Sequence, residues 1–130
     1  MVLDPKTGEL LAMANRPHFN LNLKDGLKEG ATKFAERTGC PHICVTAGSR
    51  GAGLWWDDQW FWEPSEKIEV KDTVGAGDSF LASLMNGWIV KGLTPAENLK
   101  RASRVAEFIA TCDGAMPSYK LNADGVPEKV

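Results

Sequence analysis

The sequence predicts an α/β fold in three layers, with a β-hairpin inserted between its strands. Three observations support this prediction. Short apolar segments of strand type lie at residues 42–46 and 54–62. Amphipathic helical periodicity lies at residues 23–38, 77–90 and 94–111. Finally, a glycine-rich turn follows the first strand and another precedes the second helix, as in open sheets whose ligands bind beyond the ends of the strands.

Composition indicates an ordinary globular protein. The chain has 130 residues, 43% hydrophobic and 25% charged, with a net charge of −2, which suits one domain with a real core. Its basic residues are scattered, so we expect no nucleic-acid partner. Without a long apolar run or a signal-like start we expect no membrane partner and a cytoplasmic location. The three cysteines are expected to be free thiols, and a metal site at residues 40–44 is not favoured.

Residues 1–22 are expected to form an N-terminal hairpin and loop of uncertain origin, either a common solution to a tight turn or a piece of different origin from the rest. The Pro5 and Gly8 positions favour a tight turn between two apolar segments, residues 2–3 and 10–13. Over residues 1–20 the segment resembles a strand pair of the penicillin-binding protein transpeptidase domain. A transpeptidase requires Ser-x-x-Lys, and no serine of this sequence is followed by lysine at that spacing. Transpeptidase function is therefore excluded.

The next elements follow in order along the chain. A helix from Leu23 is expected to end at Gly39, and residues 42–46 are expected to form a parallel-sheet strand buried on both faces. Residues 54–56 and 60–62 predict a hairpin with Trp55 opposite Trp60. Its tryptophans suit packing better than stacking on a ligand. A further short strand is expected at residues 68–70.

Two helices and a tail complete the predicted fold. The second helix is expected to bury one stripe of side chains: Phe80, Leu81, Leu84, Met85, Trp88 and Ile89. The third begins with a capping box, Thr94 and Glu97 around Pro95. Its Lys100, Arg101 and Arg104 are expected to lie mostly in water. A loop and a polar tail, residues 120–130, follow.

Residues 72–80, Asp-Thr-Val-Gly-Ala-Gly-Asp-Ser-Phe, carry the strongest chemical signal. Glycines before a helix allow backbone amides to converge on an anion, and the helix N-terminus adds partial positive charge. Asp78 could then accept a proton from an attacking hydroxyl. The alternative for Gly75-Ala76-Gly77-Asp78 alone is purely structural, because acids in a first helical turn and glycines in a turn need no ligand.

This stretch closely resembles the signature of the ribokinase-like (PfkB) carbohydrate kinases, and residues 24–119 resemble the C-terminal portion of that fold. The resemblance implies phosphorylation of a sugar by ATP with Mg²⁺. It assigns Asp78 as the catalytic base, Gly75, Ala76 and Gly77 as an anion hole, and Thr46, Gly48 and Gly51 as nucleotide contacts. It also implies a monovalent-cation site for K⁺ at Asp72, Gly114 and Ser118. For Asp72 the alternative is an acid that caps the turn with its own backbone.

The resemblance thus implies an ATP-dependent sugar kinase that is incomplete as a lone chain. The expected partners are ATP and a small sugar, with either a homodimer or a missing N-terminal half to cover the partial sheet. Two alternatives from other classes stay open. One is a non-catalytic nucleotide-binding or oligomerising module, and the other is a structural packing protein built on the tryptophan hairpin.

Overall fold

A computed structural model describes residues 2–3, 10–12, 24–114 and 117–130. Its regular elements occur in the following order: β1 (Val2–Leu3), β2 (Leu10–Ala12), α1 (Lys24–Thr38), β3 (His42–Thr46), a 3₁₀ turn η1 (Gly48–Arg50), β4 (Ala52–Trp56), β5 (Gln59–Glu63), α2 (Ala76–Ile89), α3 (Pro95–Ala110), β6 (Tyr119–Leu121) and β7 (Pro127–Lys129). No helix among these residues is long and apolar enough to span a bilayer.

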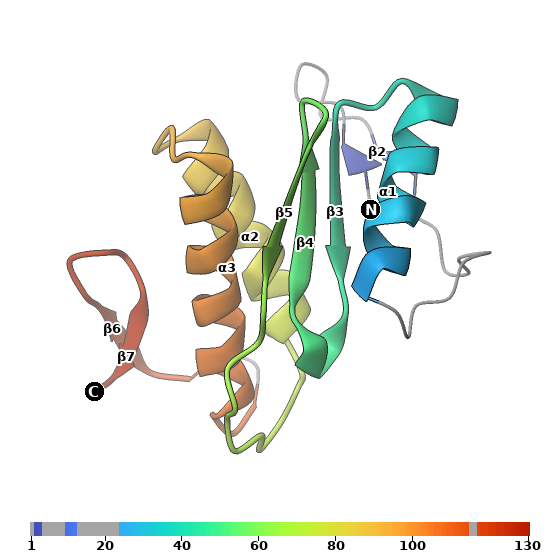
Figure 1. Cartoon of the computed structure of the whole chain (residues 1–130). Helices are drawn as coiled ribbons and strands as arrows, with labels where there is room; N and C mark the ends of the chain where they lie inside the picture. The colour runs from blue at the N-terminus through green and yellow to red at the C-terminus, as the bar shows by residue number, and fades with distance from the viewer. Residues whose placement is uncertain (1, 4–9, 13–23, 115–116) are drawn as a thin grey trace.

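The elements form three layers around a sheet of order β3-β4-β5, with α1 on one face and α2 and α3 on the other (Figure 1). Strand alternation divides the core accordingly. Leu54 of β4 lies in the cluster with Phe80, Leu84 and Leu99 of the two C-terminal helices. The opposite face of the sheet contributes a second cluster, which it forms with α1: Ala31, Cys40, Ile43 and Trp55. The predicted three-layer α/β fold is confirmed.

The tryptophan hairpin adopts the predicted register. Trp55 pairs with Trp60 across β4 and β5. Asp57 and Asp58 form the two-residue turn with φ of 45° and 65°, the left-handed values that match the twist of a hairpin. Gly53 makes room for the ring of Trp60, since a Cβ at Gly53 would lie 2.1 Å from it. The aromatic side chains therefore serve the packing of the sheet, as expected.

The prediction of a parallel, fully covered strand at residues 42–46 is wrong. β3 pairs antiparallel with β4, with Cys44 opposite Leu54, and of its residues only Ile43 is buried. The reason is the length of the connection. Only residues 47–51 separate the two strands, whereas a parallel pairing needs a crossover of a dozen residues or more.

The predicted strand at residues 68–70 is also absent from the described structure. Residues 64–70 are irregular and Val70 is 54% exposed. A strand exists only where a neighbouring strand completes its hydrogen-bond ladder, and here the chain instead meets a helix end. The amides of Lys71 and Asp72 both donate to the carbonyl of Ala110 at the C-terminus of α3, at 2.8 and 3.3 Å.

Helix α2 buries a different stripe from the predicted one. Phe80 and Leu84 are buried as expected, but Ile89 is 63% exposed, and Gly87 is buried instead. Gly87 is required by close packing against α3, since a Cβ there would lie 1.9 Å from Asn98 Oδ1. Asn98 donates from Nδ2 to the carbonyl of Leu84 at 2.8 Å. Gly87 thus determines where α2 contacts α3, and the hydrophobic pattern of α2 did not predict this contact.

Helix α3 has the predicted capping box. Glu97 N donates to Thr94 Oγ1, and Thr94 N donates to Glu97 Oε2. The prediction that its arginines lie in water is wrong. Arg101 donates to the carbonyl of Ser83 at 3.2 Å, and Arg104 is half-buried among carboxylates. Their long side chains reach over neighbouring elements, which helical periodicity does not reveal.

The two ends of the chain form small antiparallel pairs. β1 pairs with β2, in line with the predicted N-terminal hairpin. Residues 4–9, predicted to form its turn, and residues 13–23 lie outside the described residues. The predicted polar tail instead contains the β6–β7 hairpin. Asn122 Oδ1 closes that hairpin by accepting from the amides of Asp124 and Val126. Residues 122–125, Asn-Ala-Asp-Gly, are typical of a turn. This turn signal predicts a hairpin better than the polar composition predicts an irregular tail.

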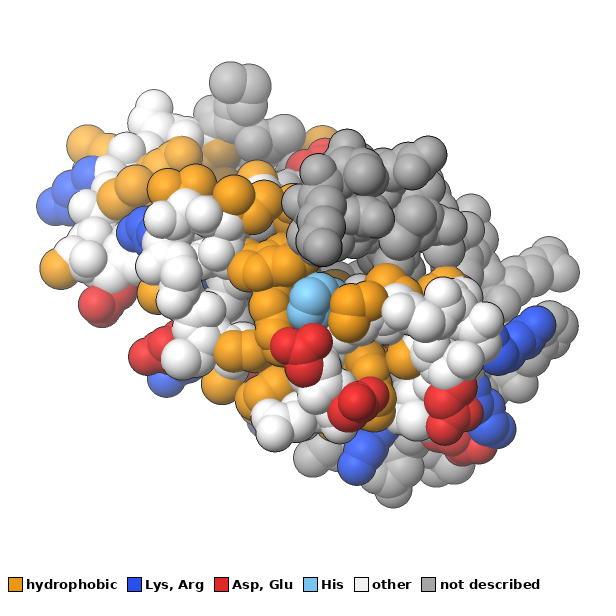
Figure 2. Space-filling view, turned by 90° about the horizontal axis from the view of Figure 1, so that it is seen from above, with side chains coloured by type: hydrophobic (Ala, Val, Ile, Leu, Met, Phe, Trp, Pro, Cys, Tyr) orange, Lys and Arg blue, Asp and Glu red, His pale blue; other side chains and the backbone are white. Residues whose placement is uncertain are grey.

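An apolar band crosses the upper face of the molecule around a histidine (Figure 2). His42 lies there between two indole rings, 3.9 Å from Trp56 and 4.9 Å from Trp88 between ring centroids. Burial lowers the pKa of His42 despite the neighbouring carboxylate of Asp57, 3.4 Å away. His42 is thus a neutral packing residue near pH 7, and no described group of three His, Cys, Asp or Glu side chains could hold a metal ion.

Candidate functional site

A cleft of about 640 Å³ opens between the sheet and α3. Its walls come from the turn after β3, the irregular segment at residues 65–70, the start of α2 and one stripe of α3. Five of the predicted site residues line this cleft: Thr46, Gly48, Gly51, Ala76 and Gly77. The structure therefore brings together two glycine turns that lie 24 or more positions apart in the sequence.

The turn after β3 contributes shape to the cleft. Gly48 has a φ of 56° and Gly51 a φ of 123°, conformations that side chains disfavour. Gly51 is also sterically required, because a Cβ there would lie 2.1 Å from the carbonyl oxygen of Glu63. The amides of Ala47, Arg50 and Gly51 all donate to carbonyls within the turn. Most donors of this turn are consequently satisfied by the protein itself.

The turn before α2 and the first turn of that helix leave two amides open. Gly75, with a φ of 81°, caps the helix without a side-chain hydrogen bond. The amide of Ala76 donates to Thr73 O at 3.2 Å, and that of Ser79 donates to Gly75 O at 2.9 Å. Within the described part of the chain, the amides of Gly77 and Asp78 have no protein acceptor. An uncapped helix N-terminus of this kind suits an anion.

Asp78 lies in the first turn of α2 and is exposed. It is not part of the cleft lining but follows Gly77, which is. A carboxylate in a first helical turn is favoured by the helix dipole. Its position beside the open amides is compatible with a base that accepts a proton from a bound alcohol. Gly75 likewise lies next to lining residues without lining the cleft itself.

The residues predicted to hold a monovalent cation are only partly brought together. Asp72 Oδ1 accepts from the amide of Val74 at 2.9 Å, which is the turn-capping alternative. Lys71 Nζ lies 3.3 Å from Asp113 Oδ2, so residues 71–72 lie near the loop that carries Gly114. Ser118 is exposed. Residues 115–116 between them lie outside the described residues, and the cation site stays a prediction.

The three cysteines are free in this structure, as expected. Cys40 and Cys112 are buried, and burial raises the pKa of the Cys44 thiol to about 12. A thiol with such a pKa is not a nucleophile at neutral pH. Cys44 therefore contributes packing and not chemistry.

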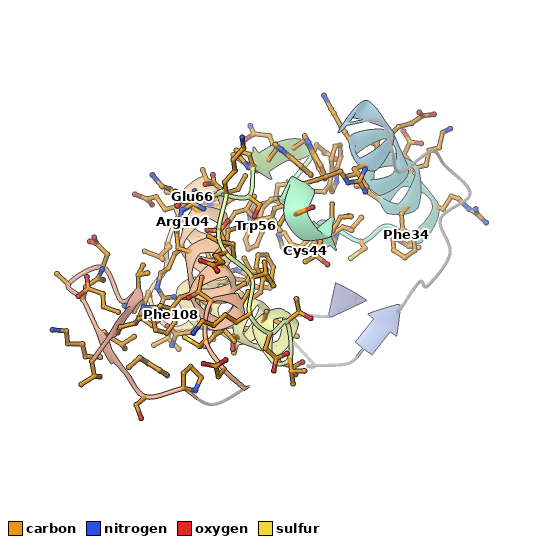
Figure 3. All side chains as sticks on the ribbon, turned by 90° about the horizontal axis from the view of Figure 1, so that it is seen from below. Phe34, Cys44, Trp56, Glu66, Arg104 and Phe108 are labelled. Atoms are coloured by element: carbon orange, nitrogen blue, oxygen red, sulfur yellow. The ribbon has the colours of Figure 1, made fainter. Side chains whose placement is uncertain are left out.

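Sequence reasoning missed a charged cluster in the wall of the cleft. Glu66 and Glu107 line the cleft, and Arg104 joins them, as Figure 3 shows for Glu66 and Arg104. Burial opposes the charge on Arg104, but Glu107, Glu66 and Glu63 outweigh it and raise its pKa. The available signal was Glu107 itself, a charged side chain that falls on the buried and otherwise uncharged face of α3.

Layers of helices on a sheet, with an open helix N-terminus and a second glycine turn facing one cleft, are typical of phosphate-binding α/β proteins. The family comparison makes this specific. The model of the pfkB family of carbohydrate kinases matches residues 2–121, so the chain belongs to the pfkB family. The family predicted from residues 72–80 is confirmed.

Individual relatives agree with this assignment. The chain is 34% identical to the fructosamine kinase FrlD of Bacillus subtilis over 101 residues, covering 75% of this chain and 35% of the relative. It is 35% identical to the fructoselysine 6-kinase of Escherichia coli over 105 residues, covering 76% and 40%. The chain thus spans little more than a third of the length of these relatives.

Solved structures confirm the ribokinase-like fold. The ribokinase of Thermotoga maritima superposes with a TM-score of 0.62 at 27% identity, over 68% of this chain and 29% of that one. The ribokinase of Arabidopsis thaliana, solved with ribose and ATP, gives a TM-score of 0.68 at 24% identity, over 76% and 32%. The latter similarity speaks for the fold alone.

Proposed function

We propose that this chain carries the nucleotide-binding and phosphoryl-transfer part of an ATP-dependent carbohydrate kinase. The observation that carries the proposal is the convergence of Gly48, Gly51, Ala76 and Gly77 on one cleft of about 640 Å³, a volume suited to a nucleotide-sized ligand. The family membership supports the reaction class. The similar fructosamine and fructoselysine kinases support a sugar or sugar derivative as acceptor.

In this proposal the turn before α2 holds the transferred phosphoryl group. The open amides of Gly77 and Asp78 and the α2 dipole stabilise the charge on its oxygens. Asp78 accepts the proton of the attacking hydroxyl. An ordinary aspartate is sufficient for this task, because in a loose transition state positioning and charge stabilisation matter more than a strong base.

The cofactors of the proposal are ATP and Mg²⁺. A protein of Escherichia coli assigned as ribokinase II was solved with ATP and Mg²⁺, at 25% identity to this chain. Mg²⁺ keeps several waters and is bound mainly through substrate phosphates, so it needs no preformed cage among the described residues. When bound with the nucleotide it neutralises phosphate charge. K⁺ at Asp72, Gly114 and Ser118 completes the proposal, and the phosphofructokinase-2 of Escherichia coli was solved with potassium.

A homodimer or a separate N-terminal half is proposed to complete the enzyme. Tetramers occur in the phosphofructokinase-2 of Escherichia coli. The second candidate function is a non-catalytic nucleotide-binding module. The observation that favours it is the exposure of Asp78, because a base that orients an alcohol works in an enclosed site.

Two measurements on the same preparation test these functions. Titration with Mg-ATP, followed by calorimetry, measures binding, and ADP release in the presence of a panel of sugars measures turnover. The kinase proposal expects both signals. Binding without turnover for any sugar supports the module, whereas the absence of both contradicts the nucleotide cleft itself.

A further inference from the structure

The cleft has one wall without regular structure, the segment at residues 64–70. Ser65, Glu66, Lys67, Ile68 and Val70 of this segment all line the cleft. No sheet ladder holds it in place in the described structure. What fixes its position is therefore the set of contacts that it makes with α3.

Glu107 holds the beginning of this wall. Its Oε1 accepts from the amide of Glu66 at 2.7 Å and from Ser65 Oγ at 3.0 Å. The residue is only 9% exposed, so both hydrogen bonds are formed largely away from solvent, where bonds to a charged group are strong. The other end of the wall is held by Ala110 O, which accepts from Lys71 N and Asp72 N.

Arg104 holds the carboxylate of Glu107 in turn. Its Nη1 lies 2.5 Å from Glu107 Oε2, its Nη2 lies 2.6 Å from Glu63 Oε1, and its Nε lies 3.1 Å from Glu66 Oε1. All three nitrogens of the guanidinium are thus engaged, each by a different carboxylate. This fixed fork ties the end of β5 and the start of the wall to one face of α3, and Figure 3 shows Arg104 and Glu66 side by side there.

We infer that Glu107 is a positioning residue for the nucleotide: with Arg104 it clamps residues 65–66 to α3 and so sets the width of the cleft. The inference rests on the proposed nucleotide site. A buried charged network costs desolvation, and an apolar residue would serve packing at least as well. A role in positioning the cleft wall explains why the chain carries this charged network, since a contribution to stability does not.

The test compares two substitutions of Glu107 with a control. Glu107→Gln retains the Oε1 acceptor for Glu66 N and Ser65 Oγ, whereas Glu107→Leu removes it. Ile109→Val is the control, because Ile109 is buried in the same helix but does not line the cleft. The readouts are hydrogen exchange of residues 64–70 without ligand and the dissociation constant of Mg-ATP.

We expect Glu107→Leu to accelerate exchange in residues 64–70 and to weaken Mg-ATP binding roughly tenfold, in keeping with the loss of a hydrogen bond to a charged group. Glu107→Gln should stay within about threefold of the parent and Ile109→Val within about twofold, on the same scale. Parental exchange and affinity in folded Glu107→Leu would overturn the clamp. If Ile109→Val weakened binding as much as Glu107→Leu, general destabilisation and not positioning would be the cause. A parent that fails to bind Mg-ATP contradicts the proposed function instead, while the exchange result still decides whether the clamp exists.

Discussion

The N-termini of α2 and α3 differ in how the backbone amides of the first helical turn find acceptors. At α3 the side chain of Thr94 accepts from the amide of Glu97, and the side chain of Glu97 accepts from the amide of Thr94. At α2 a glycine occupies the cap position, and the amides of Gly77 and Asp78 have no acceptor in the described structure. A side-chain cap typically contributes about 1 kcal/mol. Of these two helices, α2 lacks the side-chain cap, and it is the one whose first turn lines the cleft. This is the difference expected if an external anion completes the α2 terminus.

The largest difference between the two termini should appear when Asp78, the acid at the open terminus of α2, is replaced. Asp78→Asn keeps the size of an exposed side chain but removes its favourable interaction with the helix dipole, so the free energy of unfolding should fall by no more than about 1 kcal/mol. Turnover should fall by about 10²–10⁴-fold, the usual contribution of a general base, while Mg-ATP affinity is retained. ADP release and calorimetry measure the two effects.

Asp58→Asn provides the control for that substitution. Asp58 is an exposed acid in the β4–β5 turn, where asparagine also tolerates the left-handed backbone. Its turnover should equal that of the parent. An equal loss of turnover in both variants would remove the assignment of Asp78 as base.

The next effect concerns the open amide itself. Gly77→Pro removes one N–H, and proline is tolerated in the first turn of a helix. Gly77→Ala keeps the N–H, and a Cβ there meets nothing within 4 Å. Loss of one charge-assisted hydrogen bond should weaken Mg-ATP binding about tenfold or more in Gly77→Pro. If the two variants bind alike, this amide does not contact the phosphates.

A smaller effect is expected at the closed terminus. Thr94→Ala removes the cap of α3 and should lower the free energy of unfolding by about 1 kcal/mol. The dissociation constant of Mg-ATP should not move, because Thr94 does not line the cleft. Urea denaturation and calorimetry on one preparation separate the two quantities. A change in affinity would mean that the two termini are coupled.

The smallest effect is the pH dependence of the same cap. Hydrogen bonds from the side chain and the backbone of Thr94 lower the pKa of Glu97 below its ordinary value of 4.5. The stabilisation by its carboxylate is therefore fully present above pH 4.5 and is lost as the pH falls through the lower, folded-state pKa. The stability difference between the parent and Glu97→Gln, measured by urea denaturation, should shrink with acidification in that range. A difference that is constant down to the acid limit would argue against the cap.

Local signals predicted the parts of the molecule that local rules determine. The capping box of α3 and the register of the tryptophan hairpin follow from a few neighbouring residues, and both are confirmed. The two glycine turns were assigned to one site from the family resemblance, and the structure places lining residues of both on one cleft.

The features that were missed depend on distant partners. Residues 68–70 have strand-like composition, but their neighbour is the end of α3, and composition does not reveal a neighbour. Helical periodicity places Arg104 on the solvent face of α3, but in the structure it pairs with Glu63 at the end of β5. The direction of β3 could have been inferred from the short link to β4, because five residues cannot make a parallel crossover.

The most direct measurement of the central claim is a titration of the ¹⁵N-labelled protein with Mg-ATP, followed by amide chemical shifts. The account predicts that the resonances of Gly77 and Asp78 move with nucleotide concentration while that of Glu97, whose amide is already bonded to Thr94, stays in place. Unmoved Gly77 and Asp78 amides at a nucleotide concentration that saturates calorimetric binding would contradict it.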